Sequence, residues 1–350
     1  MTANLLKALI ELEKEKGIKK EELMEAVKLA LVTAFKKNFG EHQNILVEIE
    51  ESGQIKAFIQ KEVTIRKSKK RGTISLKEAR QIKPECKLGD AINVEINSEK
   101  FGRIAAQTVR QVISQKVKEA EKDLLYKEFL EKKGDIITGN IFRIEKGRVY
   151  VDLGKLEGVI PPSEQSPNDN FRVGDRVRAY VLDVKERGKD IEVILSRTHP
   201  EFVVKLFQLE VPELYEGIVT IKAFAREPGY RTKIAVHSDQ KNIDSIGACV
   251  GNKGVRVLAI VNELNEKIDV IEWSENASKF IANALSPAKV TLVKLNEPEK
   301  TALAIVPPDQ LSLAIGREGL NAKLAAKLTG WKIDIKNENL IENEEQNKEA

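Results

Sequence analysis

The sequence predicts a multidomain protein of the α+β class, with a mixed helix-and-strand domain first, a small β-barrel in the middle and a repeated αβ module last. Three observations predict this organisation. The hydrophobic periodicity changes from helical to alternating and back along the chain, and an internal repeat with a spacing of 65 residues occupies its C-terminal part. The length of 350 residues is also too great for one small core.

Helical and then alternating patterns open the chain. Apolar residues at helical spacing predict helices over 2–16 and 20–38. Alternation predicts strands at NILVEIE, QIKAFIQ, VTIRK and AINVEIN, and a long helix follows over about 103–133. We therefore predict that residues 1–133 form an α+β domain that ends in a long connector helix.

Residues 134–198 have the pattern of an all-β domain, with five short strand patterns separated by Gly, Pro and Asn turns. This pattern is typical of a small barrel of the OB type. Phe142 and Tyr150 lie on adjacent predicted strands, and with Arg143 and Arg148 they form a candidate RNA face. Because one sequence does not set the strand register, the alternative is that the aromatic side chains belong to the barrel core.

The C-terminal part of the chain contains two copies of one unit. Each copy has two strands, a short helix, a Gly-x-x-Gly tetrad, a second helix and a third strand, and the tetrads are Gly251–Gly254 and Gly316–Gly319. This order, with a helix ahead of it, is that of the prokaryotic (type II) KH fold. We predict one KH domain at 199–285, a second at 286–337 and an acidic disordered tail at 338–350.

The two tetrads are candidate RNA-binding loops. Glycine lets two helices meet at a tight turn and lets a nucleic-acid backbone approach closely, and the helix that follows offers N–H groups to phosphate. The alternative for one tetrad is an ordinary helix–turn–helix connection, but the matched pair favours KH loops. The candidate RNA-binding residues are Gly251, Asn252, Lys253, Gly254 and Arg256 in the first module and Gly316, Arg317, Glu318, Gly319 and Lys323 in the second.

The charge is mildly basic overall and unevenly distributed. The net charge is +4, whereas residues 1–133 alone carry 28 Lys and Arg against 21 Asp and Glu. An RNA surface beyond residue 133 must therefore be a local patch. The densest basic run, RKSKKR at 66–71, is typical of a solvated turn, and the alternative is a contact with nucleic acid.

Catalytic and membrane-spanning classes find no support in the sequence. The histidines His42, His199 and His237 lack partners at metal-binding spacing, and no phosphate-binding glycine motif is present. No run of about 18 apolar residues exists, and the start of the chain lacks the zones of a signal peptide. Two cysteines, Cys86 and Cys249, are too few for a disulfide framework. We expect a cytoplasmic, monomeric, non-enzymatic protein without metal or cofactor.

Several stretches resemble the NusA family of bacterial transcription elongation, termination and antitermination factors. LSRTHPEFVVKLFQLEVPEL, at 195–214, resembles the family's junction between its S1 barrel and first KH domain. REPGYRTKIAVHS and IDSIGACVGNKGVRV resemble the first KH domain, and LAIGREGLNAKLAAKLTGWKIDI resembles the second. The paired helices and the long connector fit the family's polymerase-binding domain, so the resemblance covers nearly all of 1–337.

The resemblance implies that the N-terminal domain docks on RNA polymerase by the flap of the β subunit, near the RNA exit channel. It also implies that the S1 and KH domains hold single-stranded nascent RNA, prolong pauses and join other Nus factors. Two departures limit what carries over. The sequence ends without the acidic repeats of some members, and Glu318 and Leu320 replace residues that are commonly basic or polar, so we expect the first loop to contact RNA more strongly.

Two other functions remain open. RNA-degrading enzymes such as polynucleotide phosphorylase use KH and S1 modules as accessories, but in the reverse order and after a large catalytic core, and residues 1–133 lack the clustered carboxylates of metal-assisted chemistry. A ribosome-associated RNA-binding protein or RNA chaperone is the other alternative. Affinity of residues 1–133 for RNA polymerase would distinguish a transcription factor from this last alternative.

Overall fold

The computed structural model describes residues 11–14, 16, 18–39, 44–50, 54–65, 72–96, 99–188, 190–240 and 242–339. The chain divides into two compact units, Met1–Lys127 and Glu128–Ala350, and each is described by itself. The basic run at 66–71 and the tail from residue 340 onward lie outside the described residues. In the described part of the chain, no helix has both the length and the apolar character to cross a membrane.

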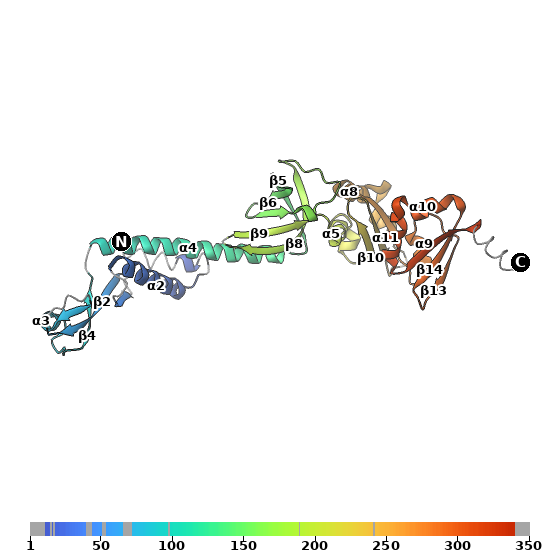
Figure 1. Ribbon diagram of the computed structural model, residues 1–350. Helices are drawn as coiled ribbons and strands as arrows, with labels where there is room; N and C mark the ends of the chain where they lie inside the picture. The colour runs from blue at the N-terminus through green and yellow to red at the C-terminus, as the bar shows by residue number, and fades with distance from the viewer. Residues whose placement is uncertain are drawn as a thin grey trace. The chain divides into compact units, whose positions relative to one another are not determined.

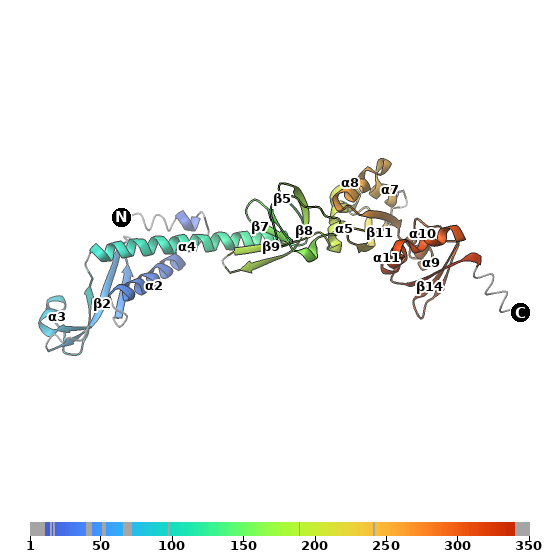
Figure 2. The ribbon, with the colours of Figure 1, turned by 45° about the horizontal axis from the view of Figure 1, so that its top comes forward.

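The first unit is built on a four-stranded sheet. Strand β2 pairs antiparallel with β1 and β4 and parallel with β3. Figures 1 and 2 show helix α2 alongside α4. Leu31 and Phe35 of α2 pack with Ile45 of β1, Ala57 of β2 and Ala105 of α4. The elements are α2 (Lys20–Phe39), β1 (Asn44–Ile49), β2 (Ile55–Thr64), β3 (Thr73–Ser75), α3 (Leu76–Ile82), β4 (Ala91–Glu95) and α4 (Glu99–Glu131), whose last residues belong to the second unit.

Two sequence expectations for this unit were incomplete. QIKAFIQ and VTIRK were predicted as separate strands, but both contribute to the single strand β2, because no glycine or proline interrupts the alternation between them. Strand β3 and helix α3 were not predicted. The signal for α3 was present, since Ser75 and Glu78 form a capping box at its start.

The second unit begins with a closed five-stranded barrel, which confirms the predicted OB-type domain. Its strands follow the order β5-β6-β7-β9-β8 around the barrel. Val149, Val151 and Leu195 are among the side chains buried inside it. The elements are β5 (Ile136–Glu145), β6 (Arg148–Asp152), β7 (Glu157–Ile160), the 3-10 turn η1 (Pro162–Glu164), β8 (Arg176–Arg187) and β9 (Asp190–Ser196).

Two modules with the predicted KH element order follow the barrel. Each has an antiparallel pair of strands and a parallel third strand, in the orders β10-β11-β12 and β13-β14-β15. The first comprises α5 (Pro200–Glu210), α6 (Pro212–Tyr215), β10 (Thr220–Glu227), β11 (Arg231–His237), α7 (Ser245–Val250), η2 (Asn252–Gly254), α8 (Val255–Leu264) and β12 (Lys267–Glu272). The second comprises α9 (Ala277–Ala284), β13 (Leu292–Asn296), β14 (Thr301–Val306), η3 (Pro308–Gln310), α10 (Leu311–Ile315), η4 (Arg317–Gly319), α11 (Leu320–Thr329) and β15 (Lys332–Asn337).

The two KH modules share one hydrophobic core. Ala235 and Ile271 of the first sheet pack with Phe280 of α9 and Leu324 of α11, and all four side chains are at most 8% exposed. One face of the first sheet is therefore covered by helices of the second module. Helix α9 lies in this shared core with α11, although the boundary predicted from sequence, between 285 and 286, assigns it to the first module; that boundary stays a prediction.

Candidate nucleic-acid interface

The two GxxG tetrads have the same backbone conformation. Gly251 and Gly316 have φ of 76° and 77° with ψ of 171° in both, a region open essentially to glycine alone. The third residues, Lys253 and Glu318, follow with left-handed φ of 52° and 54°. Each tetrad thus turns the chain from a short helix into a longer one. The predicted tight helix–helix turns are present in both modules.

The first tetrad lines a hollow on the surface. The side chains of Asn252 and Lys253 are exposed. Helix α8 begins behind them at Val255 without a side-chain N-cap. The Val255 N–H donates to the carbonyl of Asn252, so the loop backbone itself caps the start of the helix. The residues that line the hollow are Glu213, Gly247, Ala248, Gly251, Asn252, Lys253, Val255 and Arg256.

Arg256 was predicted to reach RNA, but its guanidinium turns back into the module. Its Nη1 donates to the carbonyl of Ala248 at 2.6 Å and to Oε2 of Glu213 at 2.9 Å. The pKa of Glu213 lies below its usual range, because its own backbone N–H and then Arg256 donate hydrogen bonds to the carboxylate and outweigh burial. Arg256 and Glu213 therefore form an ion pair beside the loop.

The second tetrad presents a different charge pattern on the same backbone. The side chains of Arg317 and Glu318 are 92% and 85% exposed, and their charged ends lie 3.8 Å apart. Lys323 was predicted to reach the RNA groove, but its Nζ lies 3.1 Å from the carboxylate of Glu227 in the first module. The negative charge of Glu318 offsets the positive charge of Arg317, and Lys323 neutralises the Glu227 carboxylate of the first module.

The aromatic residues of the barrel lie on its outer surface. A bulge in β5 between Ile141 and Arg143 brings both Phe142 and Arg143 opposite Tyr150. The Arg143 guanidinium is 3.9 Å from the Tyr150 ring centroid and 5.9 Å from that of Phe142, which is 39% exposed. Arg148 lies 3.9 Å from a carboxylate of β9. The core alternative is thus wrong for Phe142, and the four predicted residues share one region of the surface.

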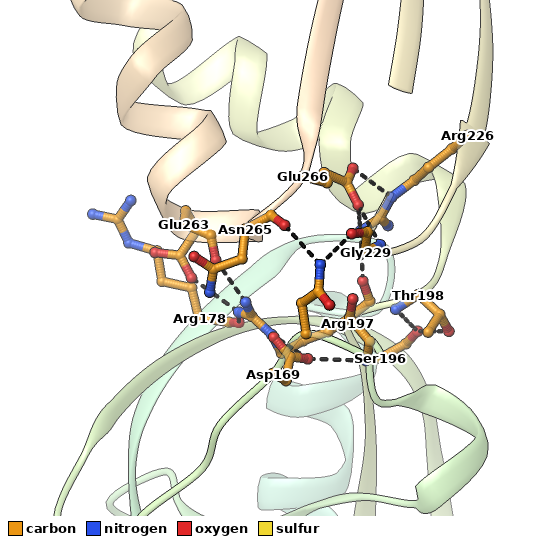
Figure 3. A network of polar contacts seen from close by, with 12 residues as sticks. Asp169, Arg178, Ser196, Arg197, Thr198, Arg226, Gly229, Glu263, Asn265 and Glu266 are labelled. Atoms are coloured by element: carbon orange, nitrogen blue, oxygen red, sulfur yellow. Dashed lines mark hydrogen bonds and ion pairs between the residues drawn. The ribbon is translucent and has the colours of Figure 1, made fainter. Parts of the chain in front are cut away.

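A buried arginine joins the barrel to the first KH module (Figure 3). The Arg197 side chain is 5% exposed, and its Nε donates to both carboxylate oxygens of Asp169 at 3.0 Å. Its Nη1 and Nη2 donate to side-chain and backbone oxygens of Glu263 in α8, at 2.9 and 2.7 Å. Burial alone would lower the pKa of Arg197, but Asp169 and Glu263 outweigh it and raise the pKa.

A second buried pair extends this network. Arg226 and Glu266 are 1% and 0% exposed, with 2.9 Å between Nε and Oε1. Arg226 also donates to the carbonyls of Arg197 and His199 at 2.8 and 2.9 Å. Sequence reasoning missed these residues. The available signal was weak: Arg197 directly follows an apolar strand, and Arg226 interrupts another.

Models of NusA domains match almost the whole chain. The NusA N-terminal domain matches residues 4–123, and the S1 RNA binding domain matches 131–196. The NusA-like first KH domain matches 197–273, and the NusA-like second KH domain matches 277–343.

Full-length relatives agree with these matches. Transcription termination/antitermination protein NusA of Halalkalibacterium halodurans is 50% identical over 340 residues, which cover 97% of this chain and 89% of the relative. The NusA proteins of Bacillus subtilis and Thermus thermophilus are 49% and 40% identical and cover 97% and 95% of this chain. These alignments span 92% and 89% of those two relatives. The chain belongs to the NusA family of transcription termination/antitermination proteins.

Proposed function

We propose that this protein is an RNA-binding transcription factor that binds RNA polymerase and single-stranded nascent RNA and thereby modulates pausing, termination and antitermination. The observation that carries the proposal is the pair of GxxG loops of identical backbone conformation, joined in one unit to an S1 barrel with an exposed aromatic and basic surface. In the described part of the chain, no group of three or more His, Cys, Asp and Glu side chains is placed to hold a metal ion.

The first KH loop is the principal RNA contact in this proposal. Its glycines allow the RNA backbone to approach, the positive end of the α8 dipole lies behind the loop, and Lys253 adds a full positive charge. The second loop, from Gly316 to Gly319, offers the same backbone with a weaker net charge, because Glu318 occupies the position of Lys253. RNA therefore binds more tightly at the first loop than at the second.

The barrel adds a stacking surface. Phe142 and Tyr150 present partly exposed rings, and Arg143 lies over the Tyr150 ring, an arrangement that suits bases of a single strand. Because Arg197 and Arg226 fix the barrel to the first KH module, one RNA strand can meet both surfaces.

The first unit is the polymerase-binding part of the proposal. The family resemblance supports docking by the flap of the β subunit, cooperation with other Nus factors and action as a monomer in the cytoplasm. These features separate a transcription factor from a ribosome-associated RNA-binding protein or RNA chaperone, since all of these bind RNA and only the first needs polymerase.

The test is the pause lifetime of the cognate bacterial RNA polymerase at a hairpin-stabilised site, with and without the protein. We expect a longer pause that Lys253→Asp shortens. Lys332→Asp is the matched control, because it makes the same charge change at an exposed lysine of β15. An unchanged pause at saturating protein that still binds free RNA would favour the ribosome or chaperone alternative.

A further inference from the structure

One side chain covers the first glycine of each KH tetrad, and it stands five positions later in both modules. A Cβ on Gly251 would lie 2.8 Å from Cγ of Arg256, and a Cβ on Gly316 would lie 2.7 Å from Cβ of Asn321. The two modules thus place an arginine and an asparagine at the same point beneath the loop.

In the second module this position is occupied by Asn321, an uncharged residue, and its contacts show the structural role of the position. It is 1% exposed, and its Nδ2 donates to the carbonyls of Leu313 and Ala314, at 3.4 and 3.0 Å, which lie in the helix before the loop. The same nitrogen donates at 3.0 Å to the carbonyl of Leu285, just after α9. A side chain this deeply buried does not contact RNA. It ties the start of α11, just after the loop, to the helix before the loop and to the segment before the sheet.

Arg256 makes the same connections with a charged group. Ala248, like Leu313, stands three residues before the first glycine, and its carbonyl accepts from Arg256 at 2.6 Å. The second bond, at 2.9 Å, is to Glu213 of α6, which precedes the first sheet as α9 precedes the second. Arg256 and Glu213 are both 31% exposed. Their ion pair therefore replaces the buried amide contacts of the second module.

We propose that Arg256 is a positioning residue, which holds the first KH loop to α6 through Glu213, and that it is not one of the phosphate contacts. The inference rests on the proposed RNA-binding function. Glu213 lines the same hollow as the tetrad, so without the positive charge of Arg256 its carboxylate would repel phosphate. The planar guanidinium suits this role because it donates to two acceptors in fixed directions at once.

The experiment measures affinity for a single-stranded RNA oligonucleotide against salt concentration, in the full-length protein. Arg256→Lys keeps the positive charge but loses the planar guanidinium and its fixed donor directions, and Arg256→Gln loses both the charge and the guanidinium. We expect each to weaken binding by about fivefold, and we expect Arg256→Lys, which keeps a positive charge beside Glu213, to leave the salt dependence unchanged. Lys253→Gln is the matched control, and it should reduce the slope of log affinity against log salt by about 0.7, as the loss of one phosphate contact to a single strand does.

Glu213→Gln tests the proposal from the other side of the pair. Removal of a carboxylate near the loop would strengthen RNA binding if charge alone mattered, but loss of the tether should weaken it by about threefold. The double variant with Arg256→Gln should then bind no worse than Arg256→Gln alone, and unchanged thermal unfolding would confirm that the variants fold.

Three results would overturn the proposal. They are wild-type affinity in Arg256→Lys, a salt slope reduced as much as in Lys253→Gln in the double variant Arg256→Gln with Glu213→Gln, or tighter binding in Glu213→Gln. No RNA binding by the wild-type protein would instead overturn the proposed function, and this inference with it.

Discussion

Lys233 of the first KH module and Leu303 of the second occupy the same place in their sheets, each paired with an aspartate of the third strand, Asp269 or Asp334. Their surroundings differ. The Lys233 side chain is 0% exposed, and its Nζ donates to Asp269 at 2.9 Å and to the carbonyl of Ser286 at 2.7 Å. Leu303 and Asp334 instead line a hollow on the second sheet.

The difference follows from what covers each face. Helices of the second module close the first sheet, and there a lysine and an aspartate fix the junction through charge-assisted hydrogen bonds. The repeat thus keeps the backbone that the loops require, while side chains diverge according to whether a neighbouring module covers them. Buried charges can set the geometry of a junction without adding much stability, but removal of one partner is costly.

The largest expected effect comes from breaking the buried pair. Asp269→Asn leaves Lys233 with a weaker partner and should lower the free energy of unfolding by about 3 kcal/mol. Asp334→Asn, at the same register in the second sheet, should change it by less than about 0.5 kcal/mol. Urea unfolding followed by tryptophan fluorescence measures both, because Trp273 and Trp331 pack against the core that the modules share. Equal effects would contradict the comparison.

The same pair predicts a pH dependence. Burial would raise the pKa of Asp269, but hydrogen bonds from Arg231 and Lys233 outweigh it and lower the pKa below 3.8. A carboxyl whose pKa is lowered on folding contributes stability above its unfolded value, and this is lost as the pH falls through the folded value. As the pH falls below about 4, the free energy of unfolding should therefore decrease less in Asp269→Asn than in the wild type. Burial also lowers the pKa of Lys233, which means that the charged form of this lysine destabilises the fold. That destabilisation is relieved as the pH rises toward 10.5 and the lysine loses its proton.

The first glycine of each tetrad gives the next largest effect. A Cβ on Gly316 would meet the backbone nitrogen of Asn321 at 2.9 Å, whereas the three nearest atoms to a Cβ on Gly251 all belong to the side chain of Arg256, the nearest at 2.8 Å. Both substitutions also strain a positive φ. We expect Gly316→Ala to lower the free energy of unfolding by about 2 kcal/mol or more and Gly251→Ala by about 1 kcal/mol. A larger loss for Gly251→Ala in urea unfolding would argue against this ranking.

Exchange of the loop charges should change RNA affinity without changing the fold. Lys253→Glu should weaken binding of single-stranded RNA by about tenfold, and Glu318→Lys should strengthen it by about threefold and steepen its salt dependence. Filter binding over a range of salt concentrations measures both. If Glu318→Lys leaves the affinity unchanged, the second loop does not face the RNA.

The smallest effect concerns Cys249 and Ala314, which stand two residues before the tetrads and are both 0% exposed. Cys249→Ala should cost about 1 kcal/mol, since it removes one buried atom. Burial raises the pKa of the Cys249 thiol to about 12, so it should resist alkylation at neutral pH until the module opens. Rapid labelling of the folded protein, in a Cys86→Ala background, would contradict this.

Local patterns predicted the elements that set the candidate site. Alternation and turn residues are sufficient for the five barrel strands, and the repeat predicts the helix–GxxG–helix order of both KH modules. The tetrads themselves define the two loops, because only glycine suits the φ and ψ of Gly251 and Gly316.

The partners of the charged side chains were not predictable in the same way. Arg256 pairs with a residue 43 positions away, and Lys323 pairs with one 96 positions away. Hydrophobic periodicity carries no information on such contacts. The position of Arg143 opposite Tyr150, on the same side as Phe142, likewise depends on the bulge in β5, which shifts the inside–outside alternation by one residue.

The network around Arg197 has a consequence for how RNA accumulates on the protein. Because it holds the barrel to the first KH module, and a shared core holds the second, an RNA strand bound at one surface as proposed would bring its neighbouring nucleotides to the next surface at high effective concentration. An RNA too short to span two surfaces gains nothing from this. Avidity therefore selects for the length of accessible single strand, and a nascent transcript acquires it only as it emerges.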